Sequence, residues 1–250
     1  MRLAFLLLAF FSLTAQREPI LVPEISEHEV RVRQGFVGTE LLLFGAILEP
    51  DGRRAGTNYD IVVVLKGPTQ AIKLREKDRV AGIWVNAQST DFQSAPSYFA
   101  VASSKPVGEI VDERTAAIYE LGLEHLQLSP SGAIDPEEQA RFTAGLVDLR
   151  QRSGLYRNDP GGVTISEGVL YQARIPLPSN VVTGTYTAET FAITQGRVIA
   201  SATTEVVVSK TGFEGRVFEF SQDWPFVYGA FAVLLSIMMG WMAGRVFRLV

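Results

Sequence analysis

The stretch WPFVYGAFAVLLSIMMGWMAG, from Trp224 to Gly244, decides how this chain is organised, because it holds 21 consecutive residues without a charge. An α-helix rises 1.5 Å per residue, so a helix of this length covers about 31 Å and matches the roughly 30 Å of a bilayer core. A single segment in hydrocarbon must satisfy its own backbone hydrogen bonds, and only a helix does so. The sequence therefore predicts one transmembrane helix over residues 224–244, with everything before it displayed on one side of a membrane.

The residues at the two ends of this stretch predict its orientation. Trp224 and Tyr228 suit the outer membrane–water interface, and Trp241 suits the inner one together with Arg245 and Arg248. Basic residues that flank a span mark its cytoplasmic side. We therefore expect residues 245–250 to form a cytoplasmic tail too short for a domain.

Small residues recur every four positions along the predicted helix, at Ala232, Ser236, Gly240 and Gly244. Small side chains at this spacing let a second helix approach closely, and helix association in lipid depends on such packing. The pattern predicts contact with another transmembrane helix, either from a second copy of the chain or from a permease. The alternative is that these residues are simply common in membrane helices and have no partner.

The N-terminus has the composition of a secretory signal peptide. Arg2 precedes an apolar run from Leu3 to Leu13, and the small residue Ala15 comes just before a polar segment. We expect residues 1–15 to be a signal peptide; the alternative is an uncleaved anchor, for which the apolar run is short. A signal peptide and one stop-transfer helix predict a single-pass protein of the bacterial inner membrane, with residues 16–220 in the periplasm.

The composition excludes several classes of function. Without Arg2, Arg245 and Arg248, the chain has 20 basic against 27 acidic residues, a net charge of −7, which argues against a nucleic-acid surface. It has no cysteine, which excludes disulfides and thiol chemistry, and its two histidines lie far apart. We expect no metal site, no cofactor and no nucleic-acid partner.

Short strand-like segments dominate the exported part. DIVVVLKGP (60–68) is β-branched and apolar and predicts a central strand that Gly67-Pro68 closes. About six such segments, among them QAIKLREK (70–77) and GIWVN (82–86), fall within roughly 80 residues. Strands resume after residue 160 and end in a hairpin across Gln195-Gly196. This rhythm predicts a mainly β fold, an immunoglobulin-like β-sandwich. The alternative is that the later strands form a second small domain.

The pattern changes between residues 111 and 153, where we expect an inserted α-helical hairpin. In the first helix Ile118, Leu121 and either His125 or Leu126 have helical spacing. Asp135-Pro136-Glu137-Glu138 is a helix start, with an N-cap acid and Pro at the first position. The second helix then has a buried stripe, which we assign to Phe142, Leu146 and Leu149.

Exposed cations are the candidates for small-molecule binding. Lys73 and Arg75 belong to a basic row of spacing two, which places them on one face of a strand, and Lys105 follows an apolar segment. They are candidate anion-binding residues, although a solvated edge strand, on which charge discourages edge pairing, is the better explanation of the row. Trp84, Asn86, Ser103 and Ser104 are also types that line ligand pockets, but turn chemistry before Pro106 accounts for the serines.

Six segments in order resemble a known family, the alphaproteobacterial putative transmembrane proteins. The resemblance spans nearly the whole chain after the signal peptide and implies a membrane protein of unknown function. It supplies no catalytic residue and implies a sulfite-exporter-type permease as a candidate partner. The segments are GFVGTELLLFGAI (35–47), DIVVVLKGP (60–68), GIWVN (82–86), YFAVASSKP (98–106), ARIPLPSNVVTGTYTAETF (173–191) and YGAFAVLLSIMMGWMAGRVF (228–247).

Together these features predict a protein that is not an enzyme. The leading hypothesis is a single-pass, membrane-anchored periplasmic accessory protein that interacts with a permease or another membrane partner. The alternative is a periplasmic domain that binds or senses a small anion through Lys73, Arg75 or Lys105. A tethered hydrolase is a second alternative, for which the sequence shows no nucleophile or phosphate-binding motif.

Overall fold

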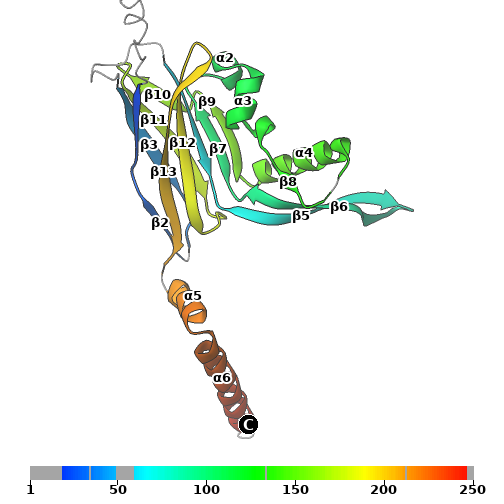
Figure 1. Cartoon of the computed structure of the whole chain (residues 1–250). Coiled ribbons are helices and arrows are strands. Elements are labelled where there is room, and N and C mark those ends of the chain that lie inside the picture. Colours follow the sequence, from blue (N-terminus) through cyan, green and yellow to red (C-terminus); the bar gives the residue numbers. More distant parts are fainter. Residues whose placement is uncertain (1–18, 34, 49–58, 133, 212, 247–250) are drawn as a thin grey trace, which may run out of the picture.

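The computed structural model describes residues 19–33, 35–48, 59–132, 134–211 and 213–246. The expected signal peptide, residues 1–15, and Arg248 of the expected tail lie outside the described residues. The described chain consists of a β-rich body, a projecting β-hairpin and two C-terminal helices (Figure 1).

Two β-sheets form the body. Their strands are β1 (Ile20–Ile25), β2 (Glu29–Val32), β3 (Gly38–Leu48), β4 (Asp60–Lys66), β7 (Phe99–Ser103), β9 (Tyr156–Pro160), β10 (Val163–Ser166), β11 (Leu170–Pro178), β12 (Gly184–Thr194) and β13 (Arg197–Lys210). One sheet has the order β1-β3-β11-β10 and the other the order β2-β13-β12-β4-β7-β9. The pairs β2–β13 and β7–β9 are parallel, and the other neighbours in these two sheets are antiparallel.

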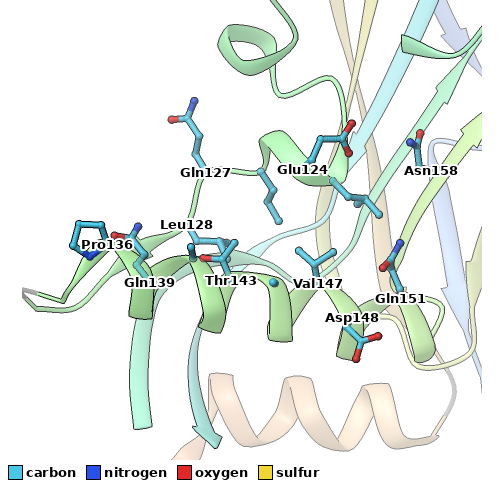
Figure 2. A pocket seen from close by; sticks show the side chains of 14 residues that line it. Glu124, Gln127, Leu128, Pro136, Gln139, Thr143, Val147, Asp148, Gln151 and Asn158 are labelled. Carbon is cyan, nitrogen blue, oxygen red and sulfur yellow. The ribbon is translucent and has the colours of Figure 1, made fainter. Parts of the chain in front are cut away.

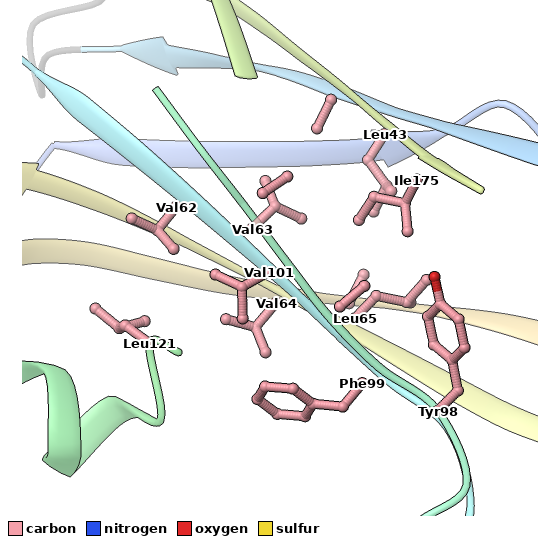
Figure 3. Close-up of a cluster of buried hydrophobic side chains, with 14 of the residues drawn as sticks. Leu43, Val62, Val63, Val64, Leu65, Tyr98, Phe99, Val101, Leu121 and Ile175 are labelled. Atoms are coloured by element: carbon pink, nitrogen blue, oxygen red, sulfur yellow. The ribbon is translucent and has the colours of Figure 1, made fainter. Parts of the chain in front are cut away.

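The six-stranded sheet is the middle layer, which explains why β4 is apolar on both faces. Every residue of Ile61–Leu65 is fully buried. Alternate side chains of a strand point to opposite faces. Figure 3 shows Val63 on the side of Ile175, from the four-stranded sheet, and Val64 on the side of Leu121, from the helical region. A strand covered on both faces has a continuous apolar sequence, as β4 does.

The prediction of a mainly β fold with one C-terminal apolar helix is confirmed. The immunoglobulin-like character of the sandwich stays a prediction.

Two edge strands were not predicted. β1 contains Pro23, which is tolerated because β1 is at the edge of its sheet. β9 has no apolar periodicity and forms through parallel pairing with β7, from Phe99↔Tyr156 to Ser103↔Pro160.

The helical insert differs from the expected hairpin in its first half. It consists of α2 (Val107–Ile110), α3 (Glu113–Tyr119), the short 3₁₀ turn η1 (Leu123–His125) and α4 (Pro136–Arg152). The first predicted helix therefore ends early, because Glu120 adopts the left-handed conformation at its C-cap and Gly122 also has positive φ. Leu121 and Leu126 are buried as expected, but Ile118 is 61% exposed.

The second predicted helix, α4, begins where the sequence predicted, but one of its three predicted buried residues is exposed. Asp135 caps it by accepting a hydrogen bond from the Glu137 backbone N–H at 2.9 Å, and Pro136 occupies the first turn. Phe142 and Leu146 are buried, whereas Leu149 is 57% exposed.

A half-buried lysine ties the helical insert to the six-stranded sheet. Lys66 Nζ donates to Glu120 Oε2 at 2.8 Å and lies 3.1 Å from Glu189 Oε2. Burial alone would lower the pKa of Lys66, but the two carboxylates outweigh it and raise that pKa. Glu120 Oε1 also accepts the Gln127 N–H at 3.1 Å, so one side chain holds both the sheet and the η1 segment.

A long hairpin, residues 69–96, projects from one end of the body and is called the arm. It is formed by β5 (Thr69–Val80) and β6 (Ile83–Pro96), and the two-residue strand β8 (Ser129–Pro130) pairs with β6 near its root. Figure 1 shows the arm reaching sideways beyond the two sheets, with α4 beside its root. The sequence predicted only two short strands here, QAIKLREK and GIWVN.

Buried tyrosines anchor the root of the arm. Tyr156 Oη donates to the carbonyl of Pro96 at 2.8 Å. Tyr98 Oη donates to the carbonyl of Pro176, in the opposite sheet, at 2.7 Å, and its ring lies 5.9 Å from that of Tyr186. Burial raises the pKa of all three phenols, for Tyr156 and Tyr186 to about 12. The arm is therefore fixed to both sheets at its base.

Candidate functional site: the membrane helix and the exposed arm

The C-terminal helix α6 (Pro225–Val246) is long and apolar enough to cross a membrane. Its span from Pro225 to Arg245 has a mean hydropathy of 1.9, and none of it is buried against the body. A helix that is hydrophobic all round needs an apolar environment. Because the body does not supply one, α6 has the properties of a membrane span.

The predicted interface anchors lie at the two ends of α6. Trp224 and Tyr228 are at its N-terminal end, where α5 (Phe213–Asp223), which was not predicted, leads into it. The ring of Tyr228 lies 6.4 Å from that of Phe220 in α5. At the other end the guanidinium of Arg245 lies 5.6 Å from the Trp241 ring centroid, a cation–π contact.

The small-residue stripe of α6 is open. Ser236 Oγ donates to the Ala232 carbonyl at 2.9 Å within the helix, which turns its polar group inward. Apart from the adjoining backbone of α6 itself, a Cβ atom added at Gly240 or Gly244 would have no atom of the described residues within 4 Å. The stripe thus leaves room for another helix from Ala232 to Gly244.

The tip of the arm, residues 80–85, carries the second exposed apolar surface. Ile83 and Trp84 are 68% and 66% exposed, and Val80 and Val85 are exposed beside them. Ala81 and Gly82 both have positive φ and form the two-residue turn. This is the geometry of a type I′ hairpin, which suits the twist of a two-stranded ribbon.

The chain matches one protein family over residues 20–249, with the description "Putative transmembrane protein (Alph_Pro_TM)". The chain belongs to this family. The resemblance noted in the sequence is thereby confirmed, and membrane association is supported by the family and by α6 together. No curated protein matches the chain.

In this member of the family the candidate anion-binding cations do not meet in one place. Lys73 lies on the arm, 3.3 Å from Asp91 Oδ2, and Arg75 lies two residues further along β5. Lys105 is at the opposite end of β4, where its Nζ is 2.9 Å from Asp60 Oδ1. Carboxylates thus hold both lysines, which weakens the anion-binding hypothesis.

The other predicted pocket residues are also apart. Ser103 is fully buried in β7, while Trp84 stands at the tip of the arm. Ser104 Oγ donates to Asp60 Oδ1 at 2.9 Å and accepts the Ile61 N–H at 3.3 Å, so it ends a strand, as its place before Pro106 indicated. Sequence reasoning treated Trp84 as a pocket residue and missed the arm, whose polar second half, NAQSTD (86–91), has no apolar signal.

A groove of about 900 Å³ lies between the η1 segment and α4 (Figure 2). Its floor is apolar, and its rim has amide and carboxylate side chains. None of the described residues that line it is basic, so it is not suited to an anion. The lining residues are Leu123, Glu124, Leu126, Gln127, Leu128, Pro136, Gln139, Ala140, Thr143, Ala144, Val147, Asp148, Gln151 and Asn158.

Proposed function

We propose that this protein is a membrane-anchored accessory protein of the bacterial inner membrane. Its β-rich body lies on the periplasmic side, and α6 binds another transmembrane helix through the stripe of Ala232, Ser236, Gly240 and Gly244. The candidate partners are a permease or a second copy of the chain.

The observation that carries this proposal is the open stripe on α6. A span that served only as an anchor would need hydrophobicity alone, and the Leu, Ile and Met residues of α6 supply that. Gly lowers helix propensity and adds no apolar area, so two glycines four residues apart favour a contact in which backbones approach closely. The absence of any side chain over Gly240 and Gly244 leaves that contact sterically free.

Substitution within α6 tests the proposal. Full-length protein is purified in mild detergent from its native membrane, and associated proteins are identified by mass spectrometry. We expect Gly240→Ile/Gly244→Ile to lose the complex, because two branched side chains would hold the partner helix away. Met238→Ile/Met242→Ile is the matched control, since it places isoleucines at the same spacing on the opposite side of the helix. An intact complex in the glycine variant, or no complex in the parent, would contradict the helix-binding proposal.

The proposed orientation is tested separately. The chain has no cysteine, so single cysteines report accessibility without background. In cells with a permeabilised outer membrane, a membrane-impermeant maleimide should label Ser89→Cys on the arm. It should not label Arg248→Cys until the inner membrane is also opened. The reverse pattern would place the body in the cytoplasm and overturn the proposal.

A further inference from the structure

The arm and the membrane helix leave the body from the same end. The register pairs Lys66, the last residue of β4, with Thr187 of β12, and Thr187 with Glu205 of β13. From this edge β4 continues through Gly67-Pro68 into the arm, and β13 runs on to Lys210 and then to α5 and α6. Figure 1 shows both extensions at this end of the two sheets. The arm is therefore rooted at the end of the body nearest the membrane.

The arm is long enough to reach a bilayer that α6 spans. The 12 residues of β5 extend about 40 Å at the rise of a β-strand. The 11 residues of α5, which separate the body from α6, extend about 16 Å at the rise of a helix. The arm exceeds this spacer about twofold. Its root is held by Tyr98 and Tyr156, so its direction relative to the body is fixed. Figure 1 shows it extending sideways, across the direction in which α5 and α6 leave the body, so its tip meets the bilayer when the body leans toward the membrane on that side.

The two faces of the tip differ in the residues they present. Cross-strand partners share a face, and the register pairs Val80 with Ile83 and Arg79 with Trp84. One face therefore has Val80 and Ile83 at the end and the pair Asp78 and Val85 behind them. The other combines Trp84 with Arg79 and, two residues back, Lys77. An exposed indole beside basic side chains is the combination that proteins place at the membrane–water interface.

The charge of the arm also differs from that of the rest of the chain. Residues 69–96 contain four basic and three acidic residues, whereas the chain between its two ends has a net charge of −7. Of the last four residues before the turn, two are basic and one is acidic. The arm, with a net charge of +1, thus carries basic residues next to its apolar tip, whereas the rest of the chain between its two ends is acidic.

We propose that the tip of the arm, residues 80–85, inserts into the outer leaflet of the bilayer that α6 spans. This inference rests on the proposed membrane anchoring. Ile83, Val80 and Trp84 enter the interfacial region, and Arg79 and Lys77 lie at the level of lipid phosphates. The protein then holds the membrane at two separated points, and the arm fixes the tilt of the body above the surface.

The test uses full-length protein in nanodiscs of phosphatidylethanolamine and phosphatidylglycerol. Ile83→Cys is labelled with the environment-sensitive dye NBD, and some of the lipids carry a nitroxide quencher near the headgroup. We expect the nitroxide lipids to lower the NBD emission about twofold or more. Leu170→Cys is the matched control, because Leu170 is 57% exposed in an apolar site at the far end of β11, away from the arm. Its emission should not change.

A label-free measurement guards against an effect of the dye. The chain has three tryptophans, so Trp224→Phe/Trp241→Phe leaves Trp84 as the sole indole, and brominated lipids should quench its emission. Emission from both probes that is quenched by aqueous iodide and not by lipid would overturn the proposal. Protection from both quenchers would show a protein covering the tip and would also overturn it. Failure of the chain to enter nanodiscs would overturn the membrane-anchoring proposal as well.

Discussion

Two consecutive strands of this protein have opposite surroundings. β4, DIVVVLK, is buried on both faces, whereas β5 follows after only Gly67-Pro68 and becomes more exposed along its length. β4 pairs with β7 and β12 in the middle of a sheet, while β5 pairs with β6 alone among the described strands. The same secondary structure thus supplies the core in one case and an extended, accessible surface in the other.

The apolar residues of the two strands therefore have different roles: those of β4 stabilise the fold, and those at the tip of the arm are available for interaction. The apolar residues of β4 gain free energy by burial in the folded body, so the fold depends on them. The apolar residues at the tip of the arm gain nothing from folding, because they stay exposed. Their hydrophobicity is therefore available for contact with something outside the chain.

The largest expected difference comes from removing apolar side chains in the two strands of this comparison. Leu65 in β4 is fully buried, so Leu65→Ala should lower the free energy of unfolding by about 2–5 kcal/mol. Ile83→Ala at the tip should change it by less than about 0.5 kcal/mol. Denaturant unfolding of both full-length variants in detergent measures the difference. A loss of several kcal/mol for Ile83→Ala would show that the tip packs on the body.

High pH should destabilise the body through its tyrosines. The pKa of Tyr156 and Tyr186 is raised to about 12, while an unfolded tyrosine has a pKa of about 10. Above about pH 10 the native state keeps protons that the unfolded state loses, so stability is full below this pH and falls as pH rises toward about 12. Each tyrosine contributes on the order of 2 kcal/mol to this loss.

The measurement is the denaturant midpoint of the full-length protein between about pH 9 and 11.5. Tyr156→Phe removes one of the titrating phenols, so the denaturant midpoint should fall less steeply as the pH rises. The variant also loses the hydrogen bond to the Pro96 carbonyl. The arm contains no tyrosine, so the decline would arise in the body and at the arm's root. A midpoint that does not change with pH in the parent would contradict this assignment.

Substitution of a lysine should cost more stability in β4 than in β5. Lys66→Met leaves the half-buried carboxylates of Glu120 and Glu189 facing each other and should cost about 1–3 kcal/mol. Lys73→Met removes an exposed pair with Asp91 and should cost less than about 1 kcal/mol. Thermal unfolding of both variants compares the costs. Equal costs would show that burial does not distinguish the two ion pairs.

An element could be predicted where its own segment of sequence contains the whole signal. This holds for β4 with its continuous apolar run, for α4 with its capping acid and proline, and for α6 with its uncharged span. The first helix of the insert was overestimated, because the spacing of Leu121 and Leu126 reflects burial and does not reveal that Glu120 turns left-handed. β9 could not be predicted, since only its partner β7 makes it a strand.

The candidate site was predicted in its membrane half only. The stripe and anchors of α6 follow from composition and period. Of the arm, only two short strands, QAIKLREK and GIWVN, were predicted, because the segment NAQSTD (86–91) is polar and resembles a loop. The alternation of QAIKLREK and the apolar residues of GIWVN indicated two short strands, but no signal showed that they belong to one long hairpin.

The smallest expected effect concerns the turn that ends the arm. Ala81 has φ of 51°, in the left-handed region, where Asn is better tolerated than Ala and where Asn-Gly is the preferred pair of a type I′ turn. Ala81→Asn should stabilise the hairpin locally by a few tenths of a kcal/mol, or about 0.5 kcal/mol at most, without changing the body. Hydrogen exchange would show slower exchange at the amides of residues 76–88 and no change in β4. Faster exchange in the arm would mean that Ala81 does not form this turn in solution. Lipid contact by Ile83 and Trp84 should persist in the variant, because the substitution alters the turn and leaves the apolar side chains in place.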